Sequence, residues 1–410
     1  MAFVFYLVYV TSYFLHLGER IPALGNIRFD LILVILTTAS IILLKEKDAQ
    51  FRLDRSGVIL LGLLLYIVAS LPFVQWPGSV MRFGLENYFK VIVFYFFTVM
   101  TITRESRLKT FIMVFVSCQA FRVLEPMYLH WTTGYWGDNT FMGDGEMMNR
   151  LAGSPYDVIN PNGLAYVTVT VVAYLYHLCP LLPGALKVVG YTALPVMVYA
   201  LVLTGSRSGM IALVGVAAVT ILTSRRKALL LVAAGIAAVF AFQNLGEMQQ
   251  ERYLSIYRDD VRGASTAQGR IDGIVKDIEV AMNNPIFGHG LGTSLEANYN
   301  IGRSVFRSHN LVMEVWQEIG LVGLLIFSFF VATGIRNLIR TLKRIGQEAD
   351  KPLLGLAKGI RAWLVLNLIF CVFSYGLSSY SWYLFGGLSV VVMRLSAGHE
   401  GETRNGAVPA

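Results

Sequence analysis

Charged residues are scarce in this sequence. Asp, Glu, Lys and Arg together make up only 15% of the 410 residues, whereas hydrophobic residues make up 55% and the mean hydropathy is +0.58. Because soluble domains carry about 25% charged residues, this composition excludes an ordinary soluble protein. It predicts a polytopic membrane protein.

Cysteine and histidine are also rare, with three and six copies. The cysteines lie within or at the ends of apolar segments and form no Cys-x-x-Cys pair. We therefore expect neither a disulfide framework nor a zinc site. The segment GDNTFMGDGE, 137–146, is acidic, but its spacing differs from that of a calcium loop. We expect no metal ion and no cofactor.

Apolar segments that approach the length of a membrane span, about 20 residues, recur along the chain. They lie near 1–17, 28–44, 57–75, 83–103, 108–125, 160–180, 186–204, 208–224, 228–243, 310–334, 361–377 and 382–395. The sequence therefore predicts an all-α, polytopic bundle of about 12 transmembrane helices. The region around SYGLSSYSW is either one bent helix or the junction of two short ones.

Lys and Arg are concentrated in four connecting segments: KEKDAQFRLDR, RESRLK, RRK and RNLIRTLKRIGQEADKPLLGLAKGIR. Basic connections stay on the cytoplasmic side of a membrane, so this threading places both termini in the cytoplasm. The net charge of +8 is then an orientation signal, and we expect no nucleic-acid partner.

The same threading divides the chain into six parts. They are N-terminal spans (1–125), a first external loop (126–159), further spans (160–243), a large external loop (244–309), C-terminal spans (310–395) and a cytoplasmic tail (396–410). In the large loop, GRIDGIVKDIEVAM has apolar residues at helical spacing and precedes an Asn-Asn-Pro turn. We expect a short amphipathic helix there.

The external basic residues are mostly arginine, whose planar fork of donors suits phosphate oxygens. Arg207 is the most informative of them, because it lies in TGSRSG, a tight turn between two apolar spans. The glycines of this turn allow close approach of the backbone, and serines such as Ser206 add hydrogen-bonding groups. For most other external arginines, pairing with the acidic residues of the large loop is the simpler explanation.

A second polar stretch, SHNLVMEVWQEIG, begins a membrane helix with His309 and Asn310. Glu314 and Glu318 follow on the same helix face as Asn310. An ionisable group inside a bilayer costs about 2.5–3.5 kcal/mol, so these side chains predict a functional site. The glutamates either orient His309 or pair with an arginine, and a plain interior salt bridge is an equal alternative.

These stretches resemble the O-antigen ligase and Wzy-type O-antigen polymerase superfamily. Its ligases carry His-Asn, nine residues, Gly, two residues and Gly, which here is His309-Asn310 followed by Gly320 and Gly323. A second family motif, Arg with Leu four positions on, resembles Arg207 with Ile211, a mild departure. Two further stretches are similar to family patterns: Arg270 ahead of NPIFGHGLG, and RLAGSPYDVINPNGLA with Arg150, Asn160 and Asn162.

The resemblance implies a glycosyltransferase in the bacterial inner membrane, with its active site facing the periplasm. Its donor would be a glycan on undecaprenyl diphosphate, and its acceptor a glycolipid or another lipid-linked glycan. Arg207 and Arg270 would bind the diphosphate leaving group in place of a metal, and His309 would be the general base. Asn310, Arg150, Asn160, Asn162, Ser206, Glu314 and Glu318 would then bind substrate or orient these groups.

Several alternatives stay open at this point. Ligase and polymerase share the leaving-group chemistry and differ in the acceptor, and a protein O-oligosaccharyltransferase is a third variant. A polysaccharide transporter or flippase would also be polytopic and rich in arginine. Transporters usually contain repeated halves, however, and the sequence has no internal repeat. His289, in FGHGLG, is the rival candidate for the base.

Overall fold

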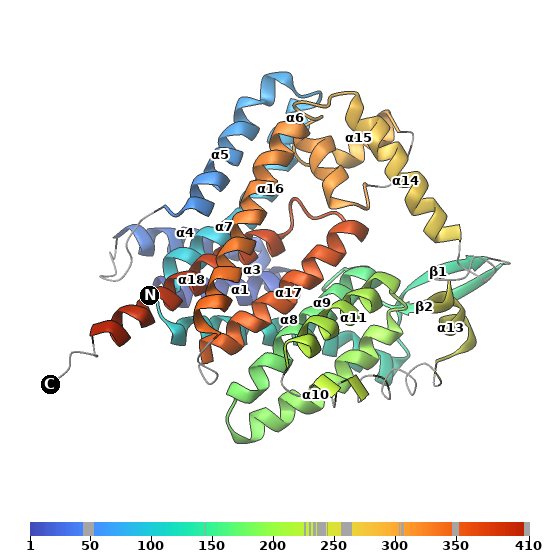
Figure 1. Cartoon of the computed structure of the whole chain (residues 1–410). Coiled ribbons are helices and arrows are strands. Elements are labelled where there is room, and N and C mark those ends of the chain that lie inside the picture. Colours follow the sequence, from blue (N-terminus) through green and yellow to red (C-terminus); the bar gives the residue numbers. More distant parts are fainter. Residues whose placement is uncertain are drawn as a thin grey trace.

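The computed structural model describes residues 1–43, 53–143, 145–224, 245–255, 265–302, 307–346 and 352–405, together with 227–228, 231–232, 235, 243 and 304. The side chains of 143, 265–271 and 398–405 lie outside this description. Within it, most residues are helical (Figure 1).

Six of the described helices or helical segments are long and apolar enough to cross a membrane. They are Pro77–Thr101 (α6, η2 Val80–Gly84 and α7 Leu85–Thr101), α8 Glu105–Thr133, Pro161–Leu181 (α9 Pro161–Leu178 and η3), α10 Gly184–Leu203, α16 Leu311–Ile345 and α17 Pro352–Phe373. Four apolar helices are shorter: α1 Ala2–Leu15, α4 Phe29–Leu43, α5 Arg55–Ala69 and α11 Arg207–Leu222. The expectation of a helical membrane protein is confirmed, whereas the number of spans stays a prediction.

The remaining elements are the shorter connecting segments and the C-terminal helix α18. They are α2 Leu17–Arg20, α3 Pro22–Asn26, η1 Leu71–Phe73, β1 Gly137–Gly143, β2 Glu146–Leu151, α13 Glu247–Leu254, α14 Ser265–Met282, α15 Ser294–Asn300 and α18 Tyr380–Asn405. Helix α14 confirms the amphipathic helix predicted in the large loop, and α17 and α18 resolve the SYGLSSYSW region into two helices. Most of the predicted span 228–243 lies outside the described residues.

The structure differs from the sequence prediction in two connections. The first external loop is not purely irregular, because β1 and β2 pair there as an antiparallel hairpin, with Gly137 opposite Leu151. This corrects the all-α expectation. Basic residues in the predicted 335–360 connection also belong to helices, because α16 runs to Ile345 and α17 already begins at Pro352. Lys and Arg are good helix formers, so a basic segment need not be a loop.

Helix α17 runs antiparallel to its neighbours α9, α11 and α16. Tyr166, near the start of α9, donates a 2.6 Å hydrogen bond to Asn367, near the end of α17. A Cβ on Gly215 of α11 would lie 2.4 Å from Ile369. At the start of α16, Asn310 donates to the carbonyl oxygen of Val372 at 3.4 Å. The beginnings of α9, α11 and α16 therefore meet at the end of α17, and we call this the polar end of the bundle.

Candidate functional site

The TGSRSG turn lies at the polar end, between α10 and α11. Gly205 has φ +57°, a conformation that L side chains rarely adopt. Ser206 then caps α11 by accepting the amide N–H of Gly209 at 3.2 Å, so that Arg207 is the first helical residue. Gly209 itself allows α11 to approach α9, because a Cβ there would lie 2.6 Å from that of Ala165. The glycines thus fix the position of Arg207.

Three buried arginines converge on this turn. Arg150 Nε donates to the carbonyl oxygen of Thr204 at 2.7 Å, and Arg252 Nε donates to that of Gly205 at 2.7 Å. Arg207 Nη1 donates to Ser255 Oγ at 2.8 Å. Their side chains are 5%, 5% and 9% exposed. We call Arg150, Arg207 and Arg252, with the turn they hold, the arginine turn.

Asn162 completes the arginine turn from the start of α9. Its Oδ1 accepts hydrogen bonds from Arg150 Nη2 at 3.0 Å and from Ser206 Oγ at 2.9 Å. The structure therefore brings together four residues that the sequence selected separately, namely Arg150, Asn162, Ser206 and Arg207. Asn160 has a local role, because it caps α9 by accepting the N–H of Gly163 at 2.8 Å.

The arginine turn has the chemistry of an anion site. Hydrogen bonds to backbone carbonyls and a hydroxyl hold the three guanidinium groups in place at this turn. The N-terminus of α11 adds the positive end of its helix dipole at the same place. Arg252 was not predicted from the sequence. It comes from α13, in the large loop, and no local motif marks it.

The His309 loop is the second polar feature at this end. His309 is exposed, and its ring centre lies 6.4 Å from that of Tyr375. The guanidinium of Arg307 lies over the same Tyr375 ring, 5.6 Å from its centre. Asn310 caps α16 by accepting the N–H groups of Val312 and Met313 at 2.9 and 3.2 Å. An exposed imidazole beside a well-ordered helix start can accept a proton from a bound hydroxyl.

Helix α16 is interrupted at Gly320, where φ is +67° and ψ is −176°. The carbonyls freed by this break accept other donors. The N–H groups of His289 and Gly290 bind the carbonyls of Gln317 and Glu318 at 2.7 and 2.9 Å. The NPIFGHGLG turn thus packs directly on the break and holds the first part of α16, with His309 just before it.

The structure corrects the expectation for the two glutamates. Glu314 accepts the N–H groups of Gly376 and Leu377 at 2.6 and 2.9 Å, in the α17–α18 connection. Glu318 accepts those of Gly292 and Ser294 at 2.7 and 3.3 Å. Neither forms an ion pair with an arginine among the described residues, and both are at most 4% exposed. Their hydrogen bonds to backbone N–H groups hold two loops in place.

His289 is fully buried, with 0% exposure. Its Nδ1 lies 2.8 Å from Gln75 Oε1, and its Nε2 lies 2.8 Å from the carbonyl oxygen of Val280. Burial lowers the pKa of this imidazole, although the hydrogen bond to Val280 opposes the shift. With both ring nitrogens occupied, His289 is a structural residue, and His309 is the better candidate for a base. Arg270 lies in α14, but its side chain is outside the described part of the chain.

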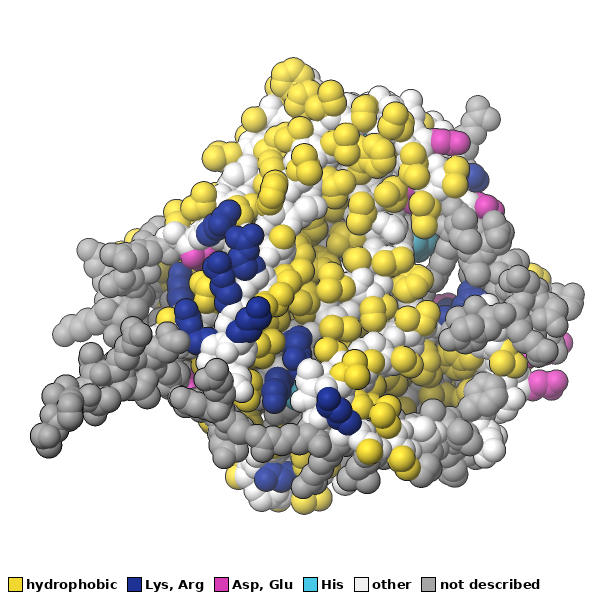
Figure 2. Space-filling model, viewed as in Figure 1, with side chains coloured by type: hydrophobic (Ala, Val, Ile, Leu, Met, Phe, Trp, Pro, Cys, Tyr) yellow, Lys and Arg dark blue, Asp and Glu magenta, His cyan; other side chains and the backbone are white. Residues whose placement is uncertain are grey.

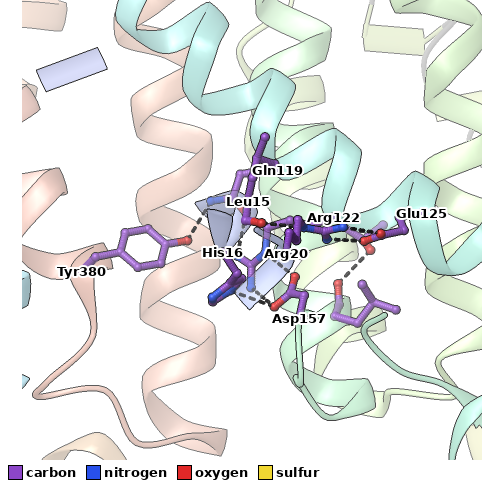
Figure 3. Close-up of polar contacts among 10 residues, drawn as sticks. Leu15, His16, Arg20, Gln119, Arg122, Glu125, Asp157 and Tyr380 are labelled. Carbon is purple, nitrogen blue, oxygen red and sulfur yellow. Dashed lines mark hydrogen bonds and ion pairs between the residues drawn. The ribbon is translucent and has the colours of Figure 1, made fainter. Parts of the chain in front are cut away.

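A buried ion-pair network adjoins the start of α9 (Figure 3). Arg122 of α8 binds Asp157 through Nε at 2.5 Å and Nη2 at 2.9 Å, and His16 Nε2 lies 3.2 Å from the same carboxylate. Burial alone would raise the pKa of Asp157, but the hydrogen bonds from His16 and Arg122 lower it to about 2. Asp157 is therefore ionised and holds the segment that leads into α9.

Two further contacts extend this network. Gln119 accepts from Arg122 Nη1 at 3.0 Å and donates to Tyr380 Oη at 3.2 Å, which ties the network to the start of α18 (Figure 3). Arg20 forms two hydrogen bonds to Glu125, each 2.5 Å long. These residues could not be predicted from local sequence, because the two arginine–carboxylate pairs join positions 35 and 105 residues apart.

A model of the O-antigen ligase family matches residues 192–328. This segment is similar to the O-antigen ligase family. Members of that family are glycosyltransferase-like enzymes, so the match supports a membrane function of the O-antigen ligase or polymerase type. A second model, of a family of unknown function, matches residues 21–148. No curated protein matches the chain.

The segment matched by the O-antigen ligase model contains most of the residues selected from the sequence: Ser206, Arg207, Arg270, His309, Asn310, Glu314 and Glu318. Arg150, Asn160 and Asn162 lie outside both matched segments. Arg150 and Asn162 nevertheless contact the TGSRSG turn of the segment 192–328 directly. The candidate site is therefore larger than the matched segment.

Proposed function

We propose that this protein is an inner-membrane glycosyltransferase that moves a glycan from undecaprenyl diphosphate to a sugar hydroxyl, with its polar end facing the periplasm. The favoured acceptor is lipid A–core, which makes it an O-antigen ligase. The observation that carries the proposal is the arginine turn, in which buried guanidinium groups from β2, α11 and α13 meet at one helix N-terminus.

The arginine turn supports a role in holding the diphosphate. Forked guanidinium donors and a helix N-terminus together stabilise the charge that develops on a departing diphosphate. Arg270 of α14 is proposed as an additional ligand to the same group. Among the described residues, no group of three or more His, Cys, Asp or Glu could hold a metal ion. We propose that arginine charge takes the place of a cation in this role.

His309 is proposed as the general base. The acceptor hydroxyl gives its proton to the imidazole as its oxygen bonds to the anomeric carbon of the donor sugar. The bond from that carbon to the diphosphate breaks, and undecaprenyl diphosphate leaves with the electron pair. The imidazolium then releases its proton to solvent. The exposed ring of His309 and the separate, buried role of His289 both support this assignment.

A Wzy-type polymerase is the alternative within the same chemistry. It would use a second lipid-linked repeat unit as acceptor, and the loops that read the acceptor decide between the two. The flippase alternative requires no chemistry. It predicts that the purified protein moves lipid-linked glycan across a bilayer but never cleaves the diphosphate linkage.

Gel analysis of the cell's glycolipids after deletion of the gene tests this proposal. A ligase is expected to lose all chains attached to lipid A–core and to accumulate lipid-linked polymer. Single attached repeats without a ladder would instead indicate the polymerase. Purified protein that releases no undecaprenyl diphosphate from a defined donor and acceptor, while it transfers donor between leaflets, would contradict the enzyme proposal and favour the flippase.

A further inference from the structure

A groove between α5 and α16 lies at the end of the bundle opposite the arginine turn. Helices α5 and α16 pack against each other, and their shared surface contains a hollow of about 480 Å³. It is lined by Ile59 and Gly62 of α5 and by Ile326, Phe329 and Ala332 of α16. Phe329 is 64% exposed, so the groove opens toward the surroundings of the helix pair.

The apolar groove ends at a smaller basic cavity. The hollow reaches Arg55, Thr333 and Arg336, and the same three residues line a second cavity of about 140 Å³ that also includes Asn337 and Arg340. Figure 2 shows dark-blue side chains gathered over the beginning of α5 and the C-terminal half of α16, beside a hydrophobic surface. The apolar lining of the groove thus adjoins the basic lining of the smaller cavity.

The three arginines of this cavity have no acidic partner among the residues that the structure describes. Arg55, Arg336 and Arg340 are exposed, and none forms a hydrogen bond or ion pair with another described residue. The one carboxylate of the cavity, Asp54, is already engaged. It accepts from the N–H groups of Ser56 and Gly57, from Tyr95 Oη at 2.7 Å and from Arg394 at 3.5 Å.

Asn337 is a second, independent sign of a ligand. It lines the cavity, its side chain is only 6% exposed, and its amide has no hydrogen-bond partner among the described residues. An amide that lines a cavity without a protein partner can bind a ligand or a water there. Arg336 and Arg340 flank it on the same helix face, four positions apart.

We propose that this groove binds one anionic phospholipid of the surrounding bilayer. Its phosphate would bind Arg55, Arg336 and Arg340, with the Asn337 amide as a further donor, and one acyl chain would lie along Ile59, Ile326 and Phe329. Phosphate accepts the forked hydrogen bonds of arginine, and the adjoining apolar groove distinguishes a lipid from a free phosphate ion. The site is independent of the proposed function, because it lies at the other end of α16 from His309.

Occupancy would stabilise the α5–α16 pair. At its opposite end α5 already holds α16, because Tyr66 Oη donates to the carbonyl of Ile319 at 2.9 Å, beside the break at Gly320. A phosphate shared by Arg55 and the two arginines of α16 would fasten the other end of the same pair. Anionic lipid would thereby support the helix that positions the His309 loop.

Binding of fluorescently labelled phosphatidylglycerol to the purified full-length protein in detergent tests the proposal. We expect Arg336→Gln and Arg340→Gln each to weaken binding about tenfold, because each loses a charge-assisted hydrogen bond. Lys343→Gln, which removes one charge from the same helix outside the groove, is expected to bind as the wild type does. Gly62→Leu keeps every charge but fills open space in the groove, and it is expected to weaken binding too.

Competition with unlabelled ligands distinguishes a lipid phosphate from a free phosphate ion. Unlabelled phosphatidylglycerol should displace the probe, whereas phosphatidylcholine and inorganic phosphate should not do so at matched concentration. Equal binding by Arg336→Gln, Arg340→Gln and Lys343→Gln would overturn the proposal, since it would show only general charge attraction. Displacement by inorganic phosphate alone, or unchanged binding by Gly62→Leu, would overturn the assignment to a lipid.

Discussion

Gly320 lies against the carbonyl of Ile286, so closely that a Cβ on Gly320 would come within 2.0 Å of that oxygen. The first glycine of the His-Asn…Gly motif is thus explained by backbone packing. Its φ of +67° and ψ of −176° are accessible almost only to glycine. Gly288, across the contact, also has positive φ, and a Cβ there would meet Glu318 and Gly320.

Gly320→Ala is therefore expected to destabilise the protein by more than about 1–3 kcal/mol, the cost of the backbone conformation alone. Gly273→Ala in α14 is a matched control, because a Cβ at that position meets nothing within 4 Å. It should be neutral, or stabilising by about 0.5–1 kcal/mol. Melting temperatures in detergent check both variants. Equal stability of the two variants would show that the contact between Gly320 and Ile286 is not required.

Arg207→Lys keeps the charge but loses the fork of donors. If Arg207 binds the diphosphate, the transfer rate should fall about 100-fold, the scale seen when one transition-state donor is lost. Arg82→Lys changes an exposed arginine of η2 in the same way and should leave the rate unchanged. The measurement is the rate of transfer from a defined undecaprenyl-diphosphate donor, with expression checked. A wild-type rate for Arg207→Lys would remove Arg207 from the site.

Arg270→Lys tests whether two distant arginines act on one leaving group. We expect the double variant, Arg207→Lys with Arg270→Lys, to cost less than the sum of the two single effects, because both side chains stabilise the same charge. The same transfer assay measures all three variants. Strict additivity would indicate that Arg270 works elsewhere, and no effect of Arg270→Lys would exclude it.

His309→Ala should lower turnover by about 10²–10⁴-fold, the usual contribution of a general base. The side chain is exposed, so the melting temperature and donor binding should change little. His289→Gln offers the contrast. It removes a fully buried ring and should lower stability more than it lowers the rate of the folded protein. Near-normal transfer by His309→Ala would mean that the wrong histidine is assigned as the base.

The buried imidazole of His289 predicts a pH dependence of stability. Its pKa is lowered in the folded protein by burial, whereas an unfolded histidine titrates near about 6.5. Below that pH the unfolded state binds more protons, so the contribution of His289 is present at neutral pH and lost on acidification. The wild type should therefore lose more melting temperature than His289→Gln between pH 7.5 and pH 5.5. Parallel losses would contradict this role.

Transfer should continue in excess EDTA if arginines neutralise the diphosphate. The assay is run with purified protein, with and without chelator, and after addition of magnesium or manganese. Activity that disappears with EDTA and returns with either metal would rule out the arrangement proposed for the arginine turn.

Local sequence was sufficient for several features of this protein. Inside a bilayer the backbone hydrogen bonds must be formed without water, which favours helices. Such helices need about 20 mostly apolar residues to cross the membrane, and segments of this kind are visible in the sequence alone. The helix in the large loop follows from periodicity. His309-Asn310 and TGSRSG were recognisable because each is a short polar interruption of an apolar chain. Arg207 begins α11, and Asn310 caps α16.

Only the tertiary structure decided which of these residues meet. Arg252 joins Arg150 and Arg207 because α13 packs against the turn. Asp157, in the segment before α9, binds Arg122 of α8. The partners of Glu314 and Glu318 could not be predicted, because a spacing of four places side chains on one face without saying which donors that face contacts. Those donors are the backbone N–H groups of distant loops. Periodicity is a property of one helix, whereas a site is made by several.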